Sequence, residues 1–179
     1  MFDLLFFKSL PFIAARRYLY SCVKIGSGSG RNVFSIGNGL VIKWAKNNKG
    51  ILQNKEEARV SGKYSILAKI HEHAPDFQWL VVEELSKFSF SSFKLKYGIT
   101  FSLFCKVLEL VDSCQLSINA PIYYSQFKNW NLLKKLVIVE DCFKLILDEN
   151  HCWGDIARYC NWRMRGNEFV LADYGLTWG

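Results

Sequence analysis

Hydrophobic and polar residues near the start of the chain alternate in a way that predicts a small antiparallel sheet. Residues 18–25, 32–35 and 40–45 are rich in β-branched and aromatic side chains, the composition typical of strands. Two turns separate them, a glycine-rich turn at 26–30 and a turn at 36–39. The second turn contains an Asn-Gly pair, which favours the positive φ angles of a tight hairpin. We therefore expect a three-stranded antiparallel meander.

A helical pattern follows in residues 53–71. The apolar residues that define it come at intervals of four, three and three, the spacing of one helix face, and are Val60, Tyr64, Leu67 and Ile70. Glu56 and Glu57 lie near the start of this segment. The residues 71–73, His-Glu-His, are expected to cap its end.

The remaining apolar segments add further strands and helices. Residues 79–82 and 168–172 are short and strand-like, whereas 99–114 and 131–147 have the spacing of helices. Residues 1–19 are expected to form a helical extension. Because the strands are mostly antiparallel and the second half is mostly helical, we predict an α+β fold.

Length and composition favour one compact domain. The chain has 179 residues, of which 50% are hydrophobic and 16% aromatic, enough to bury a core. We predict a single domain over residues 1–179. The six cysteines form no CxxC pair, and the N-terminal charges lack the order of an export signal. We therefore expect a cytoplasmic protein with reduced thiols and no membrane span.

The net charge of +7 favours an anionic partner, such as phosphate groups, nucleic acid or a membrane surface. Aromatic residues in the segment 123–130, interleaved with Lys128, Lys134 and Lys135, are able to stack on single-stranded nucleic acid. A basic nucleic-acid-binding protein is therefore one open hypothesis. The lysines are spread along the chain, however, which is more typical of a solvated surface.

The glycine-rich turn is the first candidate for chemistry. Backbone N–H groups of Gly26, Gly28 and Gly30 are able to approach phosphate because no side chain intervenes. A P-loop or a dinucleotide-binding turn would open a helix. Here a strand with Val33 follows, and the next strand carries Lys43. A glycine loop between antiparallel strands, followed by a strand lysine, is the arrangement with which protein kinases cover ATP.

Two carboxylates and an amide form a second candidate set near the C-terminus. They are Asp155, Asn161 and Asp173, and the last follows a short hydrophobic strand. Carboxylate and amide oxygens are ligands that Mg²⁺ accepts. Arg158 lies in the same segment and is a candidate to neutralise phosphate charge.

Taken together, the motifs resemble the protein-kinase-like superfamily over residues 24–175, and the short chain is similar to small kinase-like proteins encoded by bacteriophages. The resemblance implies a two-lobed fold that binds ATP and Mg²⁺, with a first lobe at 20–85 and a reduced, mostly helical second lobe at 86–179. It further implies transfer of the γ-phosphoryl group to a hydroxyl of a host protein or small molecule, in the host cytoplasm if the chain is phage-encoded.

In the first lobe, the resemblance implies that Lys43 contacts the α- and β-phosphates, with Glu57 or Glu56 as its ion-pair partner and Glu57 preferred. The nucleotide is covered by the glycine loop and Val33. A hinge that includes Glu83 and Leu85 presents backbone groups to adenine. In the second lobe, the resemblance implies that Asp155 accepts the proton or orients the nucleophile. Arg158 would neutralise phosphate charge, and the two magnesium ligands would be Asn161 and Asp173.

The sequence departs from the kinase pattern in several places. Arg31 occupies the third glycine position, and five residues rather than four separate Asp155 from Asn161. Gly154 stands where many protein kinases have an arginine, as in small-molecule kinases of the aminoglycoside and choline type. Few residues follow Gly175, so we expect no activation segment.

Alternatives of other classes stay open beside phosphoryl transfer. One is a pseudokinase that keeps the fold and acts as a protein-interaction module. A zinc site would need His71, His73, His151 and Cys152, although their spacing matches no usual zinc pattern. Cys152 or Cys160 with His151 is a further nucleophile candidate, for which no third orienting group is apparent.

Overall fold

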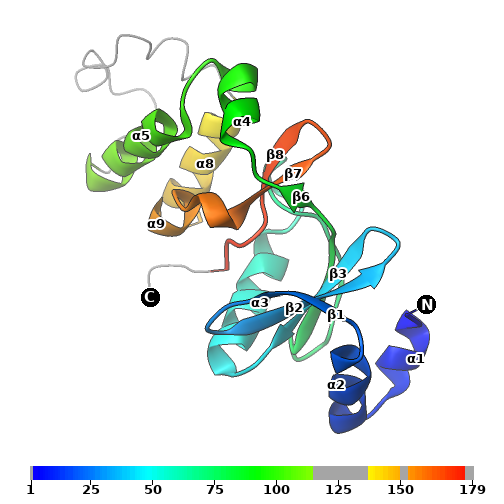
Figure 1. Ribbon diagram of the computed structural model, residues 1–179. Coiled ribbons are helices and arrows are strands. Elements are labelled where there is room, and N and C mark those ends of the chain that lie inside the picture. The colour runs from blue at the N-terminus through cyan, green and yellow to red at the C-terminus, as the bar shows by residue number, and fades with distance from the viewer. Residues whose placement is uncertain (1, 115–136, 150–152, 176–179) are drawn as a thin grey trace. The chain divides into compact units, whose positions relative to one another are not determined.

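A computed structural model describes residues 2–114, 137–149 and 153–175 (Figure 1). The chain divides into two compact units, Met1–Gly62 with Ala68–Leu85 and Lys63–Leu67 with Ser86–Gly179. Each unit contains an antiparallel sheet and helices, so the fold is α+β, as predicted. No helix in the described ranges is long and apolar enough to cross a bilayer.

The first unit is built on a five-stranded antiparallel sheet in the order β1-β2-β3-β5-β4. Its strands are β1 (Val23–Ser27), β2 (Arg31–Gly37), β3 (Leu40–Ala45), β4 (Ile70–His73) and β5 (Trp79–Glu83). The β2–β3 turn has positive φ at Asn38 (54°) and Gly39 (71°), which confirms the predicted hairpin. The meander is also confirmed, although β1 begins later than expected because residues 18–20 are helical.

A single helix, α3 (Asn48–Val60), connects β3 to β4. The predicted helix at 53–71 was therefore wrong at both ends. The Asn47 side chain accepts a hydrogen bond from the Gly50 N–H (3.1 Å) and caps the helix several residues earlier. At the other end, Gly62 adopts the left-handed region (φ 80°), a common way for helices to end. The His-Glu-His segment lies in β4 and caps no helix.

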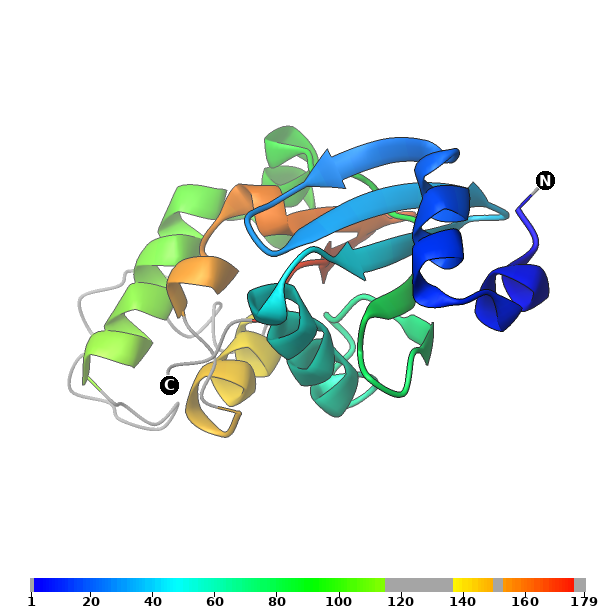
Figure 2. The ribbon, with the colours of Figure 1, turned by 90° about the horizontal axis from the view of Figure 1, so that it is seen from below.

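Two short helices, α1 (Leu4–Ser9) and α2 (Phe12–Tyr20), form the N-terminal hairpin. Phe7 and Leu19 are almost fully buried and cluster with Ile42 and Trp44 of β3. Neighbouring strand residues point to opposite faces of a sheet, and the intervening Lys43 contacts α3. The hairpin and α3 therefore cover opposite faces (Figures 1 and 2).

The second unit combines a small antiparallel sheet with helices around an aromatic core. Its strands are β6 (Ser86–Lys87), β7 (Trp162–Arg165) and β8 (Glu168–Leu171), in that order. Its helices are α4 (Phe90–Tyr97), α5 (Phe101–Cys114), α8 (Val137–Leu147), α9 (Trp153–Ile156) and the 3₁₀ turn η1 (Tyr159–Asn161). Phe93, Phe104 and Trp162 are completely buried.

Most sequence predictions for this half are confirmed. The helix at 99–114 corresponds to α5, and the strand at 168–172 corresponds to β8. The helix at 131–147 is present as α8 in its described part, while residues 131–136 lie outside the described ranges.

The segment Lys63–Leu67 belongs to the second unit, although it directly follows α3. Leu67 forms a parallel bridge with Leu171, and the Leu171 N–H donates to Ile66 O (2.6 Å). The Ser65 N–H and hydroxyl both donate to Asp141 Oδ2, at 3.1 and 2.9 Å. These contacts hold the segment extended, which explains why the predicted helix does not continue through it.

Candidate functional site

Three of the predicted site residues form one row across the sheet. Gly26 of β1 lies opposite Val33 of β2, and Val33 lies opposite Lys43 of β3. Directly opposed residues of antiparallel strands project from the same face. The row therefore lies on the face that α3 covers, and the glycine turn at 26–30 begins at one end of it.

Lys43 forms a buried ion pair with α3. Its Nζ lies 2.6 Å from Glu57 Oε2, and the two residues are 6% and 0% exposed. Arg31 Nη2 lies 2.7 Å from the other carboxylate oxygen, Oε1, and Arg31 is 5% exposed. A single buried carboxylate thus receives two cationic donors.

These cations determine the protonation of Glu57. Burial alone raises the pKa of the Glu57 carboxyl, but the charges and hydrogen bonds of Arg31 and Lys43 outweigh it, so the pKa is lowered. Glu57 is therefore ionised at neutral pH. Glu56, the other candidate partner, instead pairs with Arg59 at 2.6 Å on the same helix.

Arg31 is the main residue of this cluster that the sequence did not assign. Its Nη1 also donates to Asn54 Oδ1 (3.1 Å), and the Asn54 amide donates to Phe77 O (2.8 Å). The only signal in the sequence was the arginine at the third glycine position of the motif. Its burial depends on the partners that α3 supplies, and these become apparent only when the helix is placed.

Glycine serves different purposes at the different positions of the turn. A side chain at Gly30 would lie 2.4 Å from Gln53 Oε1, and one at Gly50 would lie 2.2 Å from Gly30 O, so the turn and α3 approach too closely for a Cβ. Gly28 has open space around it and is exposed. Gly30 therefore has a packing role, whereas the open space around Gly28 leaves room for a ligand, although the Gly28 N–H itself donates to Arg31 O (2.8 Å).

The turn is attached to the start of α3 through its carbonyl groups. Lys46 Nζ donates to Gly28 O, Asn47 Nδ2 donates to Ser29 O (3.1 Å), and the Lys46 N–H donates to Gly30 O (2.8 Å). With its carbonyls held in this way, the turn has a defined conformation in the structure.

The predicted hinge lies at the boundary between the two units. The Glu83 N–H donates to Lys69 O (3.1 Å), and the Glu84 N–H donates to Gly39 O (2.7 Å). Within the described residues, the N–H of the half-buried Leu85 has no acceptor. Of these three positions, Leu85 is thus the one whose backbone donor is open to a ligand.

The second candidate set is assembled within the second unit by the β7–β8 hairpin. Asn161 directly precedes β7 and Asp173 follows β8, and the Ala172 N–H donates to Asn161 O (2.7 Å). Asn161 Nδ2 donates to Asp155 O (2.9 Å). The hairpin therefore brings the loops of all three predicted residues to one place.

Asp155 and Asp173 differ in their surroundings. Asp155 is 8% exposed, and its Oδ1 lies 3.3 Å from Nη1 of the exposed Arg158. Asp173 is exposed. Between Asp155 and Asn161 the chain forms the 3₁₀ turn Tyr159–Asn161.

The donor chemistry of this set is compatible with magnesium. Since the Asn161 nitrogen is used by Asp155 O, its Oδ1 and the exposed Asp173 carboxylate supply the oxygen ligands that Mg²⁺ prefers. No group of three or more His, Cys, Asp or Glu side chains in the described ranges is arranged to hold a metal ion. The zinc hypothesis gains no support from His71 and His73, which lie on exposed positions of β4, while His151 and Cys152 are outside the described residues.

Two other candidates can be placed only in part. Cys160 is exposed, with its Sγ 3.6 Å from Asn161 Oδ1, and its predicted partner His151 is not among the described residues. The aromatic and lysine-rich segment at 123–135, considered for nucleic-acid stacking, also lies outside them.

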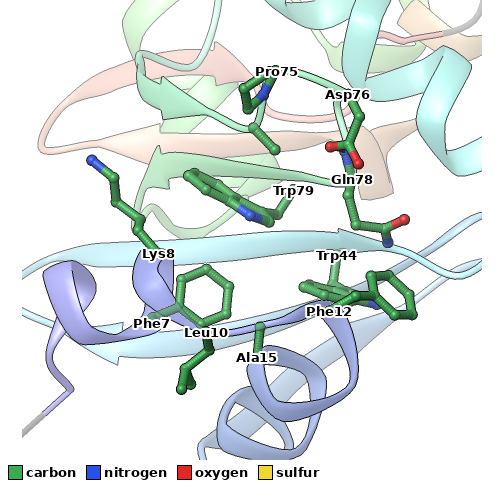
Figure 3. A pocket seen from close by; sticks show the side chains of 11 residues that line it. Phe7, Lys8, Leu10, Phe12, Ala15, Trp44, Pro75, Asp76, Gln78 and Trp79 are labelled. Atoms are coloured by element: carbon green, nitrogen blue, oxygen red, sulfur yellow. Dashed lines mark hydrogen bonds between the residues drawn. The ribbon is translucent and has the colours of Figure 1, made fainter.

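An aromatic hollow of about 370 Å³ lies on the other face of the first sheet, between the N-terminal hairpin and the β4–β5 turn (Figure 3). Phe7, Phe12, Trp44 and Trp79 line it, with Lys8 at one side and Asp76 and Gln78 at the other. None of the predicted site residues lines this hollow. Trp44 and Lys43 are adjacent in β3 and point to opposite faces, so the hollow and the ion pair are separated by the sheet.

No known protein family model matches the chain, and no curated protein is significantly similar to it. The function must therefore be inferred from the geometry of these residues.

Proposed function

We propose that the chain is a kinase-like, two-lobed ATP-binding protein that uses Mg²⁺ and transfers the γ-phosphoryl group to a hydroxyl acceptor. The observation that carries the proposal is the buried Lys43–Glu57 pair, 2.6 Å apart, in register with Gly26 and Val33. A lysine fixed in this way beside a glycine turn is suited to bind the α- and β-phosphates. The five-stranded antiparallel sheet with one connecting helix supports the same proposal.

In this proposal the first unit binds the nucleotide. Lys43 contacts the phosphates, the turn at 26–30 covers them, and Leu85 offers its open N–H to the base. Because the Gly28 N–H donates to Arg31 O, it is not one of the donors to phosphate. Glu57 acts through Lys43, since it lies fully buried behind it.

The second unit supplies the groups for transfer. Asp155 orients the acceptor hydroxyl and takes its proton, and Arg158 beside it balances phosphate charge. Asp173 and Asn161 would hold the magnesium ion, which neutralises charge on the phosphates when bound. The proposal requires both residue sets to act on one nucleotide.

Transfer is tested with γ-labelled ATP and the full chain in the presence of candidate protein and small-molecule acceptors. We expect labelling that Asp155→Ala abolishes and that Asp148→Ala, at an exposed position of the same unit, leaves intact. Labelling that survives Asp155→Ala would contradict the role of Asp155.

The second candidate function is a protein-interaction module that binds nucleotide without transfer. Large apolar side chains on the surface of the two N-terminal helices favour it, since Leu5 is 78%, Ile13 65% and Phe12 53% exposed. Magnesium-dependent ATP binding without label transfer to any acceptor would support this function over catalysis.

A further inference from the structure

We propose that Arg31 is a positioning residue that holds Glu57, and through it Lys43, in a single geometry before any ligand binds. The consequence for nucleotide affinity rests on the proposed function. The structural part, the immobilisation of the Lys43 ammonium group, is independent of it.

Both oxygens of the Glu57 carboxylate are engaged. Glu57 uses one oxygen for Lys43 (2.6 Å) and the other for Arg31 (2.7 Å). With a donor on each oxygen, rotation of the carboxylate would break one bond or both. All three residues are at most 6% exposed, so water has little access to replace a lost partner.

Arg31 is itself oriented by two acceptors on α3. Its planar guanidinium donates from Nη2 to Glu57 and from Nη1 to Asn54 Oδ1 (3.1 Å). Asn54 is 0% exposed and donates from its nitrogen to Phe77 O (2.8 Å), in the turn between β4 and β5. A continuous chain of hydrogen bonds thus runs from this turn to Lys43.

Helix α3 is attached to the sheet both near its start and in its second half. Near its start, Asn47 binds Ser29 O, and Gly50 lies so close to Gly30 that neither tolerates a Cβ. Farther along, Asn54 and Glu57 bind Arg31. A shift of the helix would break contacts at both ends, so the position of Glu57 is set by the fold.

Lysine has a flexible stem, so its ion pairs restrict it less than a guanidinium fork does. By fixing the carboxylate, Arg31 fixes the position at which the Lys43 ammonium meets Glu57. A preorganised cation loses less entropy when phosphate binds. Arg31, at the third glycine position of the motif, thus helps to keep the Lys43 ammonium in one position.

The test uses the side-chain ammonium signal of Lys43 in ¹⁵N NMR of the full chain without ligand, assigned by its absence in Lys43→Met. We expect Arg31→Met to broaden or remove this signal while the backbone amide spectrum stays folded. Arg31→Lys, which keeps the charge and loses the fork, is expected to give an intermediate signal. Arg59→Met, at a half-exposed arginine of α3, should leave the Lys43 signal unchanged.

An unchanged Lys43 signal in folded Arg31→Met overturns the proposal. If Arg31→Met does not fold, Asn54→Ala removes one anchor of the fork and retains all three charges, and an unchanged signal there overturns it equally. Mg-ATP titration forms a separate arm, in which Arg31→Met should weaken binding on the order of 10- to 100-fold, as for other residues that orient a ligand-binding side chain. If wild-type chain binds no ATP, the proposed function fails while the NMR result still decides the role of Arg31.

Discussion

At the scale of single residues, the carboxylate of Glu57 is the centre of the first candidate site. It is fully buried, yet two cations within 2.7 Å keep it ionised. A buried charge of this kind is costly to leave without partners, whereas an exposed ion pair contributes little. The ion pairs of α3 therefore differ sharply in their expected contribution to stability.

We expect Glu57→Gln to lower the free energy of unfolding by about 3 kcal/mol or more, because both cations would lose their buried counter-charge. The matched control is Glu56→Gln on the same helix, whose pair with Arg59 is partly exposed and whose loss should cost no more than about 1 kcal/mol. Urea unfolding of the three proteins measures the difference. Equal stability of the two variants would contradict the account of the buried cluster.

The stabilisation by Glu57 should also depend on pH. The folded-state pKa of Glu57 lies below its ordinary value of 4.5, so the unfolded chain binds the proton more readily. The stabilisation is therefore fully present above that value and is lost as the pH falls through the lowered pKa. Unfolding measured from neutral pH into acid should show wild-type chain and Glu57→Gln converging in stability. A difference that stays constant with pH would be inconsistent with an ionised Glu57.

At the scale of elements, the contact between the glycine turn and α3 determines how the first site is built. The turn packs through Gly30 against Gly50, and its carbonyls bind Lys46 and Asn47. Glycine is needed in this turn for close packing as well as for approach to a ligand. The two requirements can be separated by substitution.

We expect Gly30→Ala and Gly50→Ala each to destabilise the chain by about 1–3 kcal/mol, since the new methyl group meets backbone atoms or the Gln53 side chain. Gly28→Ala should be nearly neutral because no atom lies within 4 Å of the added carbon. Thermal unfolding of the three variants tests this. Destabilisation by Gly28→Ala equal to that of Gly30→Ala would refute the packing role.

The N-terminal hairpin gives a second prediction at this scale. Phe7 is 1% exposed and packs against Trp44 and Trp79, with ring centroids 6.3 and 5.5 Å away. Phe7→Ala should cost about 3–5 kcal/mol, as is usual for a large buried ring. Leu5→Ala, in the same helix but 78% exposed, should have little effect in the same unfolding experiment. A small loss for Phe7→Ala would mean that the hairpin is not part of the core.

The elements also show how much of the fold was predictable. Local signals sufficed for the β2–β3 hairpin, where the Asn-Gly pair has the positive φ angles that it favours. They failed for α3, because its buried face is polar and consists of Gly50, Gln53, Asn54 and Glu57 as well as Val60. Hydrophobic periodicity cannot detect a buried helix face whose side chains are polar and hydrogen-bonded. The apolar residues at 64–70 instead led to a predicted helix that was too long at its C-terminal end.

At the scale of the whole molecule, the chain forms two compact units, and it passes from one to the other more often than the sequence suggested. Residues after α3 join the second unit before the chain returns to β4 in the first. This crossing depends on long-range contacts such as Ser65 with Asp141, which no local pattern encodes. For the candidate sites, the order of motifs made Lys43, Asn161 and Asp173 candidates, whereas the contacts of Arg31 became apparent only from the three-dimensional neighbours of its guanidinium.

The most direct test of the central claim is isothermal titration of the full chain with ATP in the presence of Mg²⁺. We predict saturable binding that is weakened about tenfold or more by Lys43→Met and by Asp173→Asn, because a hydrogen bond to a charged group contributes roughly 1.5–3 kcal/mol. Lys55→Met and Asp148→Asn, at exposed positions of the corresponding units, should bind like wild type. The absence of binding by the wild-type chain, or equal affinity in all four variants, would contradict a magnesium-dependent nucleotide site at these residues.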